Sequence, residues 1–235
     1  MAPSSSHIMN ILLLHGALGT ERQLAILAES LDHTNCRRFT FSGHGDGEVP
    51  GEGLSFELFL KDIDAAMQRS DGPVHLFGFS MGGYAALLWA ARNPGRVASV
   101  STLGTKVVWT PEGLQKELRK LDPALIEEKV PAFAAGLAAA HGPTRWKELV
   151  KHTADLMTRL AAAPLLTDDV LASIEAPVLL MVGDRDTTAV PEDTLLTARK
   201  LKDAGVMVLP RTCHPFEETD LDLLITQLMR FWEGA

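Results

Sequence analysis

Short apolar runs alternate with amphipathic segments along most of the chain. Segments that stay apolar at successive positions are typical of parallel strands, which helices cover on both faces. The pattern predicts six strands, over residues 10–15, 36–41, 74–79, 97–103, 178–182 and 206–209.

The segments between these runs carry apolar side chains at the three- and four-residue spacing of a helix. They predict helices over residues 20–31, 55–67, 84–92, 192–201 and 221–232. Strands that alternate with helices imply an α/β fold. We expect a three-layer α/β/α sandwich around a mostly parallel, doubly wound sheet of about six strands.

The alternation stops over residues 106–174, which are rich in Ala and Leu and contain no clear strand. This segment is too long for one ordinary crossover. It predicts a helical cap, inserted after the fourth strand and lying over the strand ends, where open α/β sheets bind ligands. Crossover helices packed beside the sheet are the alternative. The core then comprises residues 9–105 and 175–235.

The first eight residues contain neither the basic start nor the apolar middle of a signal peptide. Their serine-rich sequence resembles a leader added for expression. We therefore assign residues 1–8 to a leader and take Met9 as the candidate natural start.

Composition narrows the classes of partner. The chain has 22 basic and 30 acidic residues, for a net charge of −8, which argues against binding to nucleic acid or an anionic membrane. No apolar stretch reaches the roughly 18 to 20 residues that span a bilayer. The two cysteines, Cys36 and Cys213, are too few for a disulfide framework. We expect a cytoplasmic protein acting on a small, neutral or weakly charged molecule.

The sequence lacks the signatures of common cofactors. Its glycine-rich segment at 43–47 does not follow G-x-G-x-x-G, and no Walker lysine is present. Neither an H-E-x-x-H motif nor paired cysteines indicate a metal site. We expect a reaction that needs no cofactor and no metal.

A candidate nucleophile lies where the third strand meets the next helix. Residues 78–82 read Gly-Phe-Ser-Met-Gly and match G-x-S-x-G, in which glycines permit a sharp turn that exposes the serine hydroxyl. A chain of this length contains the motif by chance about once in twelve. Its position between an apolar strand and a helix makes it specific, and it predicts Ser80 as nucleophile. A helix-capping serine is the alternative.

A serine hydroxyl needs a base, and the base needs a carboxylate to orient it. His214 follows the last strand and so reaches the same end of the sheet as Ser80. His75, His33, His141 and His152 lie in less suitable places. The acid is Asp184 or Asp186, which both follow the fifth strand, and Asp186 is favoured because it lies further into the loop and can reach the next one. Both could instead be simple turn formers.

An oxyanion hole needs two backbone N–H groups. Met81, which follows the nucleophile, is one expected donor. The turn after the first strand supplies the other, with Ala17 favoured over Leu18.

Four segments together resemble the α/β-hydrolase superfamily, over almost the whole chain. His15-Gly16 resembles its oxyanion loop, residues 42–46 resemble its P-G-H-G-x-S loop, and residues 78–83 resemble its nucleophile elbow. Residues 183–186 resemble its G-x-x-D segment, whose last residue is the acid, and this implies Asp186. The chain departs from the pattern at Cys213, where a glycine usually precedes the histidine.

The resemblance implies a serine hydrolase that cleaves a small carboxyl ester through an acyl-enzyme on Ser80. A thioester, a lactone or a C–C bond β to a carbonyl are alternatives for the same residues. The elbow also resembles that of the lyase SHCHC synthase, in which an arginine that grips an acidic substrate stands where this chain has Tyr84. A catalytically inactive ligand-binding homologue is a further alternative.

Aromatic and apolar residues near these segments are candidates for the substrate pocket. They are Leu18, Phe41 and Tyr84 in the core and Trp109, Phe133 and Trp146 in the cap. Aromatic residues in a cap are as often part of its own core. Arg145 and Lys147 are more typical of solvated surface than of an anion site.

Overall fold

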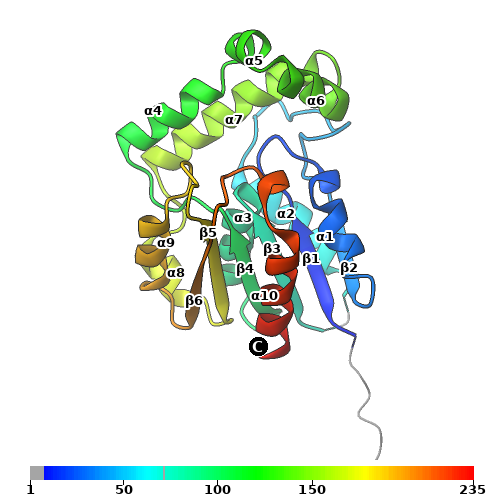
Figure 1. Cartoon of the computed structure of the whole chain (residues 1–235), viewed down its shortest axis with the longest axis vertical. Coiled ribbons are helices and arrows are strands. Elements are labelled where there is room, and N and C mark those ends of the chain that lie inside the picture. Colours follow the sequence, from blue (N-terminus) through cyan, green and yellow to red (C-terminus); the bar gives the residue numbers. More distant parts are fainter. Residues whose placement is uncertain (1–7, 71) are drawn as a thin grey trace, which may run out of the picture.

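The computed structural model describes residues 8–70 and 72–235, so residues 1–7 of the proposed leader lie outside the described residues. Its centre is a sheet of six parallel strands in the order β2-β1-β3-β4-β5-β6 (Figure 1). This confirms the predicted sheet. The strands are β1 (Asn10–Leu14), β2 (Asn35–Phe39), β3 (Val74–Phe79), β4 (Val97–Leu103), β5 (Val178–Gly183) and β6 (Ala204–Leu209).

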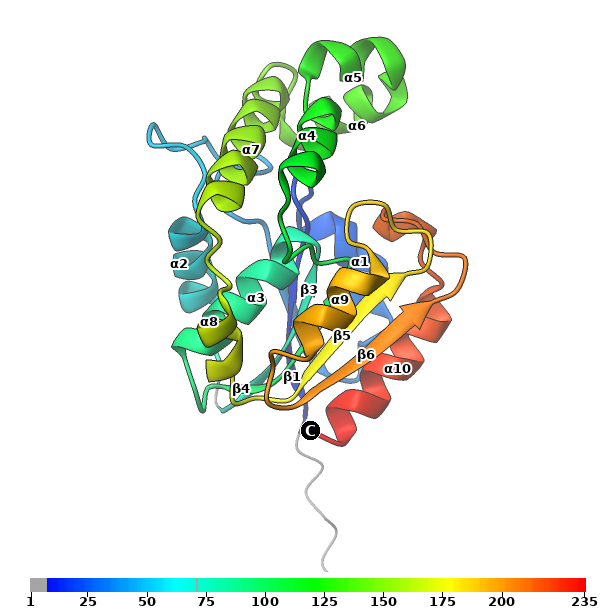
Figure 2. The ribbon, with the colours of Figure 1, turned by 90° about the vertical axis from the view of Figure 1, so that its left-hand side faces the viewer.

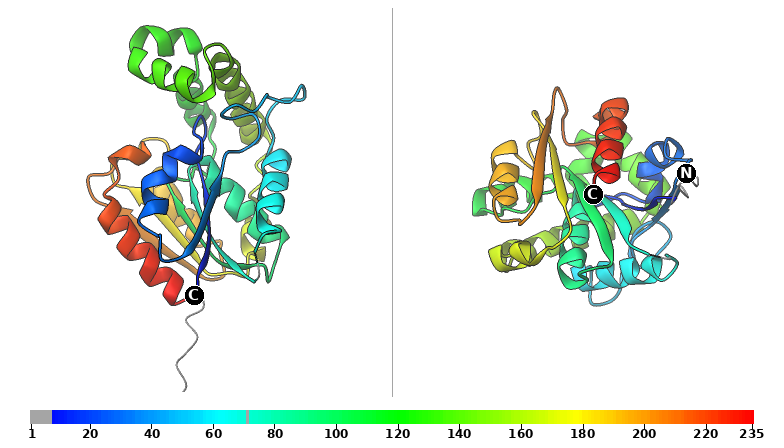
Figure 3. Two further views of the ribbon diagram at one scale, coloured as in Figure 1. Left: turned by 90° about the vertical axis from the view of Figure 1, so that its right-hand side faces the viewer. Right: turned by 90° about the horizontal axis from the view of Figure 1, so that it is seen from below.

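Helices cover both faces of the sheet, as the three-layer prediction requires (Figure 3). The short 3-10 helix η1 (Glu21–Leu24), α1 (Ala25–Glu29) and α10 (Leu221–Glu233) pack on one face. The other face carries α2 (Phe56–Met67), α3 (Met81–Arg92), α8 (Asp168–Ser173) and α9 (Pro191–Ala198).

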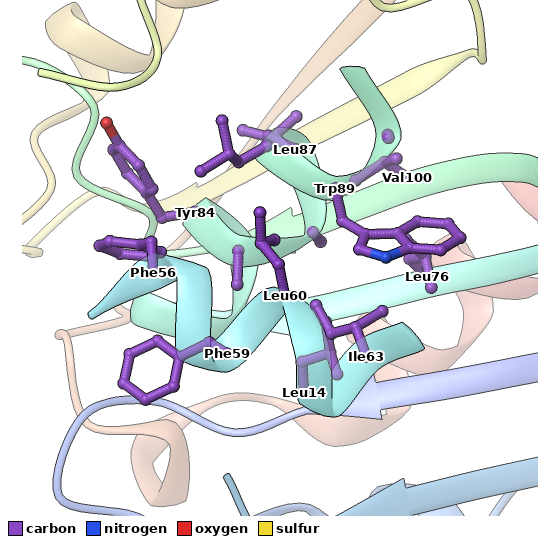
Figure 4. Packing of buried hydrophobic residues seen from close by; sticks show 14 of the residues in the cluster. Leu14, Phe56, Phe59, Leu60, Ile63, Leu76, Tyr84, Leu87, Trp89 and Val100 are labelled. Atoms are coloured by element: carbon purple, nitrogen blue, oxygen red, sulfur yellow. The ribbon is translucent and has the colours of Figure 1, made fainter. Parts of the chain in front are cut away.

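Most of the larger apolar cluster lies between the sheet and helices α2 and α3 (Figure 4). Phe56, Phe59 and Ile63 of α2 are buried, with the Phe56 ring against Tyr84 of α3 and the Phe59 ring against Phe41 and His44 (Figure 4). Burying each such side chain contributes roughly 1.5–3 kcal/mol. Trp89 is buried as well, and its indole N–H donates to the Asp64 carboxylate at 2.8 Å.

Two predicted elements have different bounds for identifiable reasons. The second strand ends at Phe39 instead of residue 41 because the Phe41 N–H donates to the His15 ring, at 2.9 Å, instead of to a neighbouring strand. The helix expected over 20–31 is divided into η1 and α1. Thr20 begins it, as its hydroxyl accepts a hydrogen bond from the N–H of Arg22.

The predicted helical insertion after the fourth strand is present. Figure 2 shows α4 (Pro111–Lys120), α5 (Pro123–Lys129), α6 (Pro131–His141) and α7 (Arg145–Ala162) as a layer over the carboxyl ends of the strands. A proline opens each of α4, α5 and α6, where its missing N–H removes no helical bond. We call α4–α7 the cap.

Helix α8 belongs to the sheet layer instead of the cap. Leu171 and Ile174 are buried in the main core cluster, and α8 packs against α3. The insertion therefore combines both sequence interpretations, with a cap followed by one crossover helix.

The strand order reverses direction beside β1. The connection from β1 leads outward to β2, and the next one returns past β1 to β3, so β1 and β3 are neighbours, with Leu14 paired to Gly78. Such a switch point leaves a crevice at the carboxyl ends of the two strands. The cap lies above this crevice.

Candidate active site

Ser80 occupies a strained turn between β3 and α3. Its backbone has φ 51° and ψ −113°, a conformation that costs a non-glycine residue about 1–3 kcal/mol. Neighbouring strands hold it there. The Ser80 N–H donates to the Leu103 carbonyl at 2.8 Å, and its own carbonyl accepts from the Thr105 hydroxyl at 3.0 Å. The turn directs the side chain away from the ladder of strand hydrogen bonds.

The two glycines of the motif allow the backbone to pack closely around this turn. A Cβ on Gly82 would lie 2.2 Å from the Leu14 carbonyl oxygen, and one on Gly78 would lie 2.3 Å from the Gly83 nitrogen. Neither contact can be relieved by moving a side chain. The sequence pattern therefore has a steric cause in this structure.

His214 and Asp186 extend from Ser80 in a hydrogen-bonded series. The Ser80 hydroxyl lies 3.2 Å from His214 Nε2, and His214 Nδ1 lies 2.8 Å from Asp186 Oδ2. Because an ionised carboxylate only accepts, Nδ1 carries the ring proton and Nε2 is left to accept from Ser80. The second Asp186 oxygen, Oδ1, accepts from the N–H groups of Thr188 and Ala189 at 2.8 and 2.9 Å. Both oxygens of this buried carboxylate are thus occupied.

Asp184, the alternative acid, has another place. Its exposed carboxylate accepts from the Thr212 N–H at 3.1 Å, and hydrogen bonds from the Arg211 and Thr212 backbones hold the pKa of Asp184 below its ordinary value. It therefore fastens the loop that carries His214 and does not contact the imidazole itself.

The two expected oxyanion donors lie on the wall of one cavity with Ser80. Met81 opens α3, where backbone N–H groups have no partner within the helix. Ala17 follows β1. Its neighbour Leu18 has φ 59° and does not line the cavity, so of these two residues the structure brings Ala17 to Ser80.

The buried side chain of His15 is neutral and supports the turn after β1, which carries Ala17. Its Nε2 accepts from the Phe41 N–H at 2.9 Å, so Nδ1 carries the proton and donates to the Gly16 carbonyl at 2.8 Å. Burial, with a smaller contribution from His44, lowers the pKa of His15 to about 3. The His-Gly pair is thus a structural support, since the imidazole has no access to solvent or to Ser80.

The cavity above Ser80 is narrow, with about 50 Å³ accessible to the centre of a water-sized sphere. One water needs roughly 10–15 Å³ by this measure, so the space holds only a few. Its wall is mostly apolar, and Tyr84 and Trp109 contribute to it as predicted candidates. Further apolar residues come from α2 and α7, namely Phe56, Leu156, Met157 and Leu160.

Four predicted pocket residues lie elsewhere. Phe133 is half exposed on α6, and Trp146 is buried in the cap's own apolar cluster. Phe41 packs edge to face on His15, and Leu18 packs between the core and cap clusters.

Sequence reasoning did not select two charged residues that line the cavity, Lys106 and Glu117. Lys106 follows the end of β4 by three residues, and this position at a strand end is a signal that could have identified it. Its ammonium donates to the Thr188 carbonyl at 3.1 Å. Glu117 is buried and accepts from Lys120 at 3.0 Å.

Arg145 and Lys147 make contacts away from the cavity. Arg145 donates to the Asp46 carbonyl at 2.6 Å, and Lys147 pairs with Glu127 at 2.7 Å. Among the described residues, no group of three or more His, Cys, Asp or Glu side chains is arranged to hold a metal ion. Over the same residues, no helix combines the length and the apolar character needed to cross a bilayer.

Comparisons with known proteins identify the family and the fold of this chain. The model of the family described as "Alpha/beta hydrolase family" matches residues 11–222. NosK from Streptomyces actuosus is 22% identical with a TM-score of 0.82, and the alignment covers 97% of this chain and 99% of that one. At this identity the likeness concerns the fold.

Two sequence relatives match over shorter segments. A Haemophilus influenzae protein provisionally named 2-succinyl-6-hydroxy-2,4-cyclohexadiene-1-carboxylate synthase is 37% identical over 86 residues, which are 35% of this chain and 34% of that protein. Human monoglyceride lipase is 32% identical over 110 residues, 43% of this chain and 36% of the lipase. The matched part of the chain thus spans about a third of the length of each relative.

Proposed function

The chain belongs to the alpha/beta hydrolase family, and from this premise we propose that it is a serine hydrolase that cleaves a small carboxyl ester through an acyl-enzyme on Ser80. The observation that carries the proposal is the hydrogen-bonded series from Ser80 through His214 to Asp186, at 3.2 and 2.8 Å. Human monoglyceride lipase, one of the sequence relatives, is named for ester cleavage and supports the same class of bond.

In the first half-reaction, Ser80 Oγ attacks the ester carbonyl carbon while its proton moves to His214 Nε2. Asp186 stabilises the resulting imidazolium, and the N–H groups of Met81 and Ala17 donate to the oxyanion. The C–O bond then breaks, and the leaving alkoxide takes the proton from Nε2. In the second half-reaction water gives a proton to His214 Nε2 and attacks the acyl carbon. The bond from that carbon to Ser80 Oγ then breaks, His214 returns the proton to Ser80 Oγ, and the acid leaves.

The cavity favours a short acyl chain. Its accessible space holds only a few water-sized groups, and its wall is mostly apolar. We expect turnover of p-nitrophenyl esters to be fastest for acetate to butanoate and to fall for octanoate and longer chains.

Replacement of the nucleophile tests the mechanism. The Ser80→Ala variant is expected to lose about 10⁴-fold or more in kcat toward p-nitrophenyl acetate, since the acyl-enzyme cannot form. A fluorophosphonate probe should label the parent protein and leave this variant unlabelled. Ser173→Ala, at an exposed position on α8, is the matched control and should keep full activity. Activity that survives in a folded Ser80→Ala variant would contradict the proposal.

Lys106 favours a second candidate, in which the same residues act on an acidic substrate, as in the lyase that the elbow resembles. Tyr84 replaces the arginine of that lyase, and its hydroxyl is occupied by the N–H groups of Leu165 and Leu166 at 3.0 and 2.9 Å. Lys106 instead places a cation on the cavity wall. The Haemophilus relative, named as a synthase of a carboxylate, supports this candidate.

An ester with a carboxylate at the end of its acyl chain distinguishes the two candidates. If the substrate is acidic, the parent should prefer mono-p-nitrophenyl glutarate to the neutral butanoate, and Lys106→Met should remove that preference. Lys116→Met is the matched control, because Lys116 also donates to a loop carbonyl, that of Thr187 at 2.9 Å, but does not line the cavity. A preference that is absent, or unchanged in Lys106→Met, rejects the acidic substrate.

A further inference from the structure

His141 connects the cap to two loops of the core. It is the last residue of α6 and is almost completely buried. Its Nδ1 accepts from the Gly45 N–H at 2.9 Å, and its Nε2 lies 2.9 Å from the Leu18 carbonyl oxygen. Both loops follow strands of the sheet, and one of them carries the expected oxyanion donor Ala17.

The protonation state of this imidazole follows from its partners. Gly45 can only donate through its N–H, so Nδ1 has to be the unprotonated nitrogen. Nε2 then carries the proton and donates to the Leu18 carbonyl. Burial lowers the pKa of His141, which is consistent with a neutral ring that has one donor and one acceptor.

The Leu18 carbonyl is a sensitive point of the oxyanion loop, residues 16–19. Leu18 has φ 59°, a left-handed conformation that is unfavourable for a leucine. The Ala17 N–H belongs to the planar peptide that also carries the Gly16 carbonyl. The Gly16 carbonyl accepts from the Gly19 N–H at 3.1 Å, and this N–H shares its planar peptide with the Leu18 carbonyl, so the hydrogen bond from His141 is linked to the Ala17 N–H through two peptide units.

We propose that His141 is a positioning residue for the oxyanion hole, which holds the Leu18 carbonyl from the cap and so keeps the Ala17 N–H directed toward the oxyanion that forms when Ser80 attacks. This inference rests on the proposed function. It assigns part of the catalytic geometry to a side chain outside the α/β core.

Other residues also anchor the cap to the core. Arg145 donates to the carbonyl groups of Asp46 and Gly45 at 2.6 and 3.4 Å, and Arg159 donates to the Leu54 carbonyl at 2.5 Å. Within the part of the chain that the structure describes, His141 makes the one side-chain hydrogen bond that joins α4–α7 to residues 16–19. Arg145→Ala is therefore a matched control, because it loosens the cap without removing the bond to Leu18.

The test compares His141→Ala, His141→Gln and Arg145→Ala with the parent. Loss of a well-placed oxyanion donor lowers kcat by 10²–10³-fold, so partial misplacement in His141→Ala should lower kcat by about 10- to 100-fold, with KM within a factor of about three. His141→Gln retains one acceptor and one donor and should recover most of this loss. Arg145→Ala should keep kcat.

A tetrahedral inhibitor separates positioning from a general structural role. Affinity for phenylboronic acid, whose adduct with Ser80 places an oxygen in the oxyanion hole, should fall in His141→Ala by the same factor as kcat. Complete labelling of Ser80 by a fluorophosphonate, given time, should persist. If His141→Ala does not fold, His141→Leu replaces it, since leucine fills similar space without either hydrogen bond.

Three results would overturn the inference: an unchanged kcat in His141→Ala, a change confined to KM, or an equal loss of kcat in Arg145→Ala. A parent protein that neither hydrolyses esters nor reacts with the fluorophosphonate overturns the proposed function instead, and this inference with it. Ester hydrolysis that depends on Ser80 but not on His141 leaves the proposed function intact and rejects the positioning role.

Discussion

The turns at the strand ends and the cap hold their side chains in different ways. In the turns, hydrogen bonds from backbone and side chains hold Asp186 and Ser80: both oxygens of Asp186 are occupied, and Ser80 is bonded through its N–H and its carbonyl. In the cap, apolar packing dominates, and just before α4 Trp109 keeps a buried indole N–H that has no hydrogen-bond partner among the described residues. Under the proposed function, the turns would fix which bond is broken, whereas the cap would select which molecule reaches it.

The largest expected effect tests the rigidity of the strand-end turns. In Asp186→Asn, the amide oxygen has to face the N–H groups of Thr188 and Ala189, so the amide NH₂ faces His214. The imidazole must then accept through Nδ1 and carry its proton on Nε2, where it cannot take the proton of Ser80. We expect kcat to fall by about 10⁴-fold, as it does when the same change is made in serine proteases.

Asp184→Asn is the control for this prediction. Its carboxylate accepts from Thr212 without contacting His214, so kcat should change less than about threefold, a small effect beside the loss expected at Asp186. Steady-state kinetics of both purified variants with p-nitrophenyl acetate would decide the matter. Equal losses of kcat in the two variants would show that Asp186 has no special role beside His214, which would contradict the prediction.

A pair of glycines compares the two regions directly. Gly82→Ala places a Cβ about 2.2 Å from the Leu14 carbonyl oxygen, and this backbone atom cannot move aside. The substitution should destabilise the folded protein by roughly 3 kcal/mol or more. In the cap, a Cβ on Gly136 meets nothing within 4 Å, so Gly136→Ala should stabilise α6 by up to about 1 kcal/mol. Urea unfolding followed by circular dichroism measures both. A cap glycine as sensitive as Gly82 would remove the distinction.

The smallest expected effect concerns acid stability near the cap–core junction. Burial lowers the pKa of His15 to about 3 and that of His44 to about 4. Above pH 6.5, both are neutral in the folded and the unfolded chain, and they make no pH-dependent contribution. As the pH falls below 6.5, the unfolded chain binds protons that the folded protein refuses, so stability declines by about 1.4 kcal/mol per pH unit for each residue, or about 2 kcal/mol each by pH 5.

In His44→Gln, the unfolding free energy should fall less steeply with decreasing pH, by about 1.4 kcal/mol per pH unit, the contribution of one proton. Urea unfolding at several pH values between 5 and 8 measures this slope. His33→Gln, at an exposed position, serves as the control and should leave the slope unchanged. An identical slope in the parent and His44→Gln would contradict the assignment of His44 as a neutral group in the folded state.

The same contrast explains what the sequence could predict. The carboxyl ends of parallel strands lie at one edge of the sheet. The positions of Ser80, Asp186 and His214 after three strands were therefore enough to predict that they lie close together. In the structure the three side chains form one hydrogen-bonded series. The choice of Asp186 over Asp184 rested on its position further into the same loop, with the resemblance as support, and the structure buries Asp186 and leaves Asp184 exposed.

The cap was less predictable because the orientation of its side chains depends on how four helices pack on one another. Trp109 and Trp146 are the same residue type in the same segment, yet Trp109 lines the cavity and Trp146 fills the cap's interior. Phe133 carries no sequence signal that would separate it from either, and it lies half exposed. Helix α8 has the composition of the cap but packs on α3, since only tertiary contacts decide where the insertion returns to the sheet.

Both ends of the insertion are tied to the elbow itself. Thr105, just before the insertion, donates its hydroxyl to the Ser80 carbonyl, and the Tyr84 hydroxyl, one turn into α3, accepts the N–H groups of Leu165 and Leu166 where the cap rejoins the core. The segment between Thr105 and Leu165 is therefore attached to the core at both of its ends. Cap sequences of other lengths can be exchanged there, by evolution or by design, while the nucleophile keeps its place. Selectivity in such a protein can diverge far faster than its chemistry.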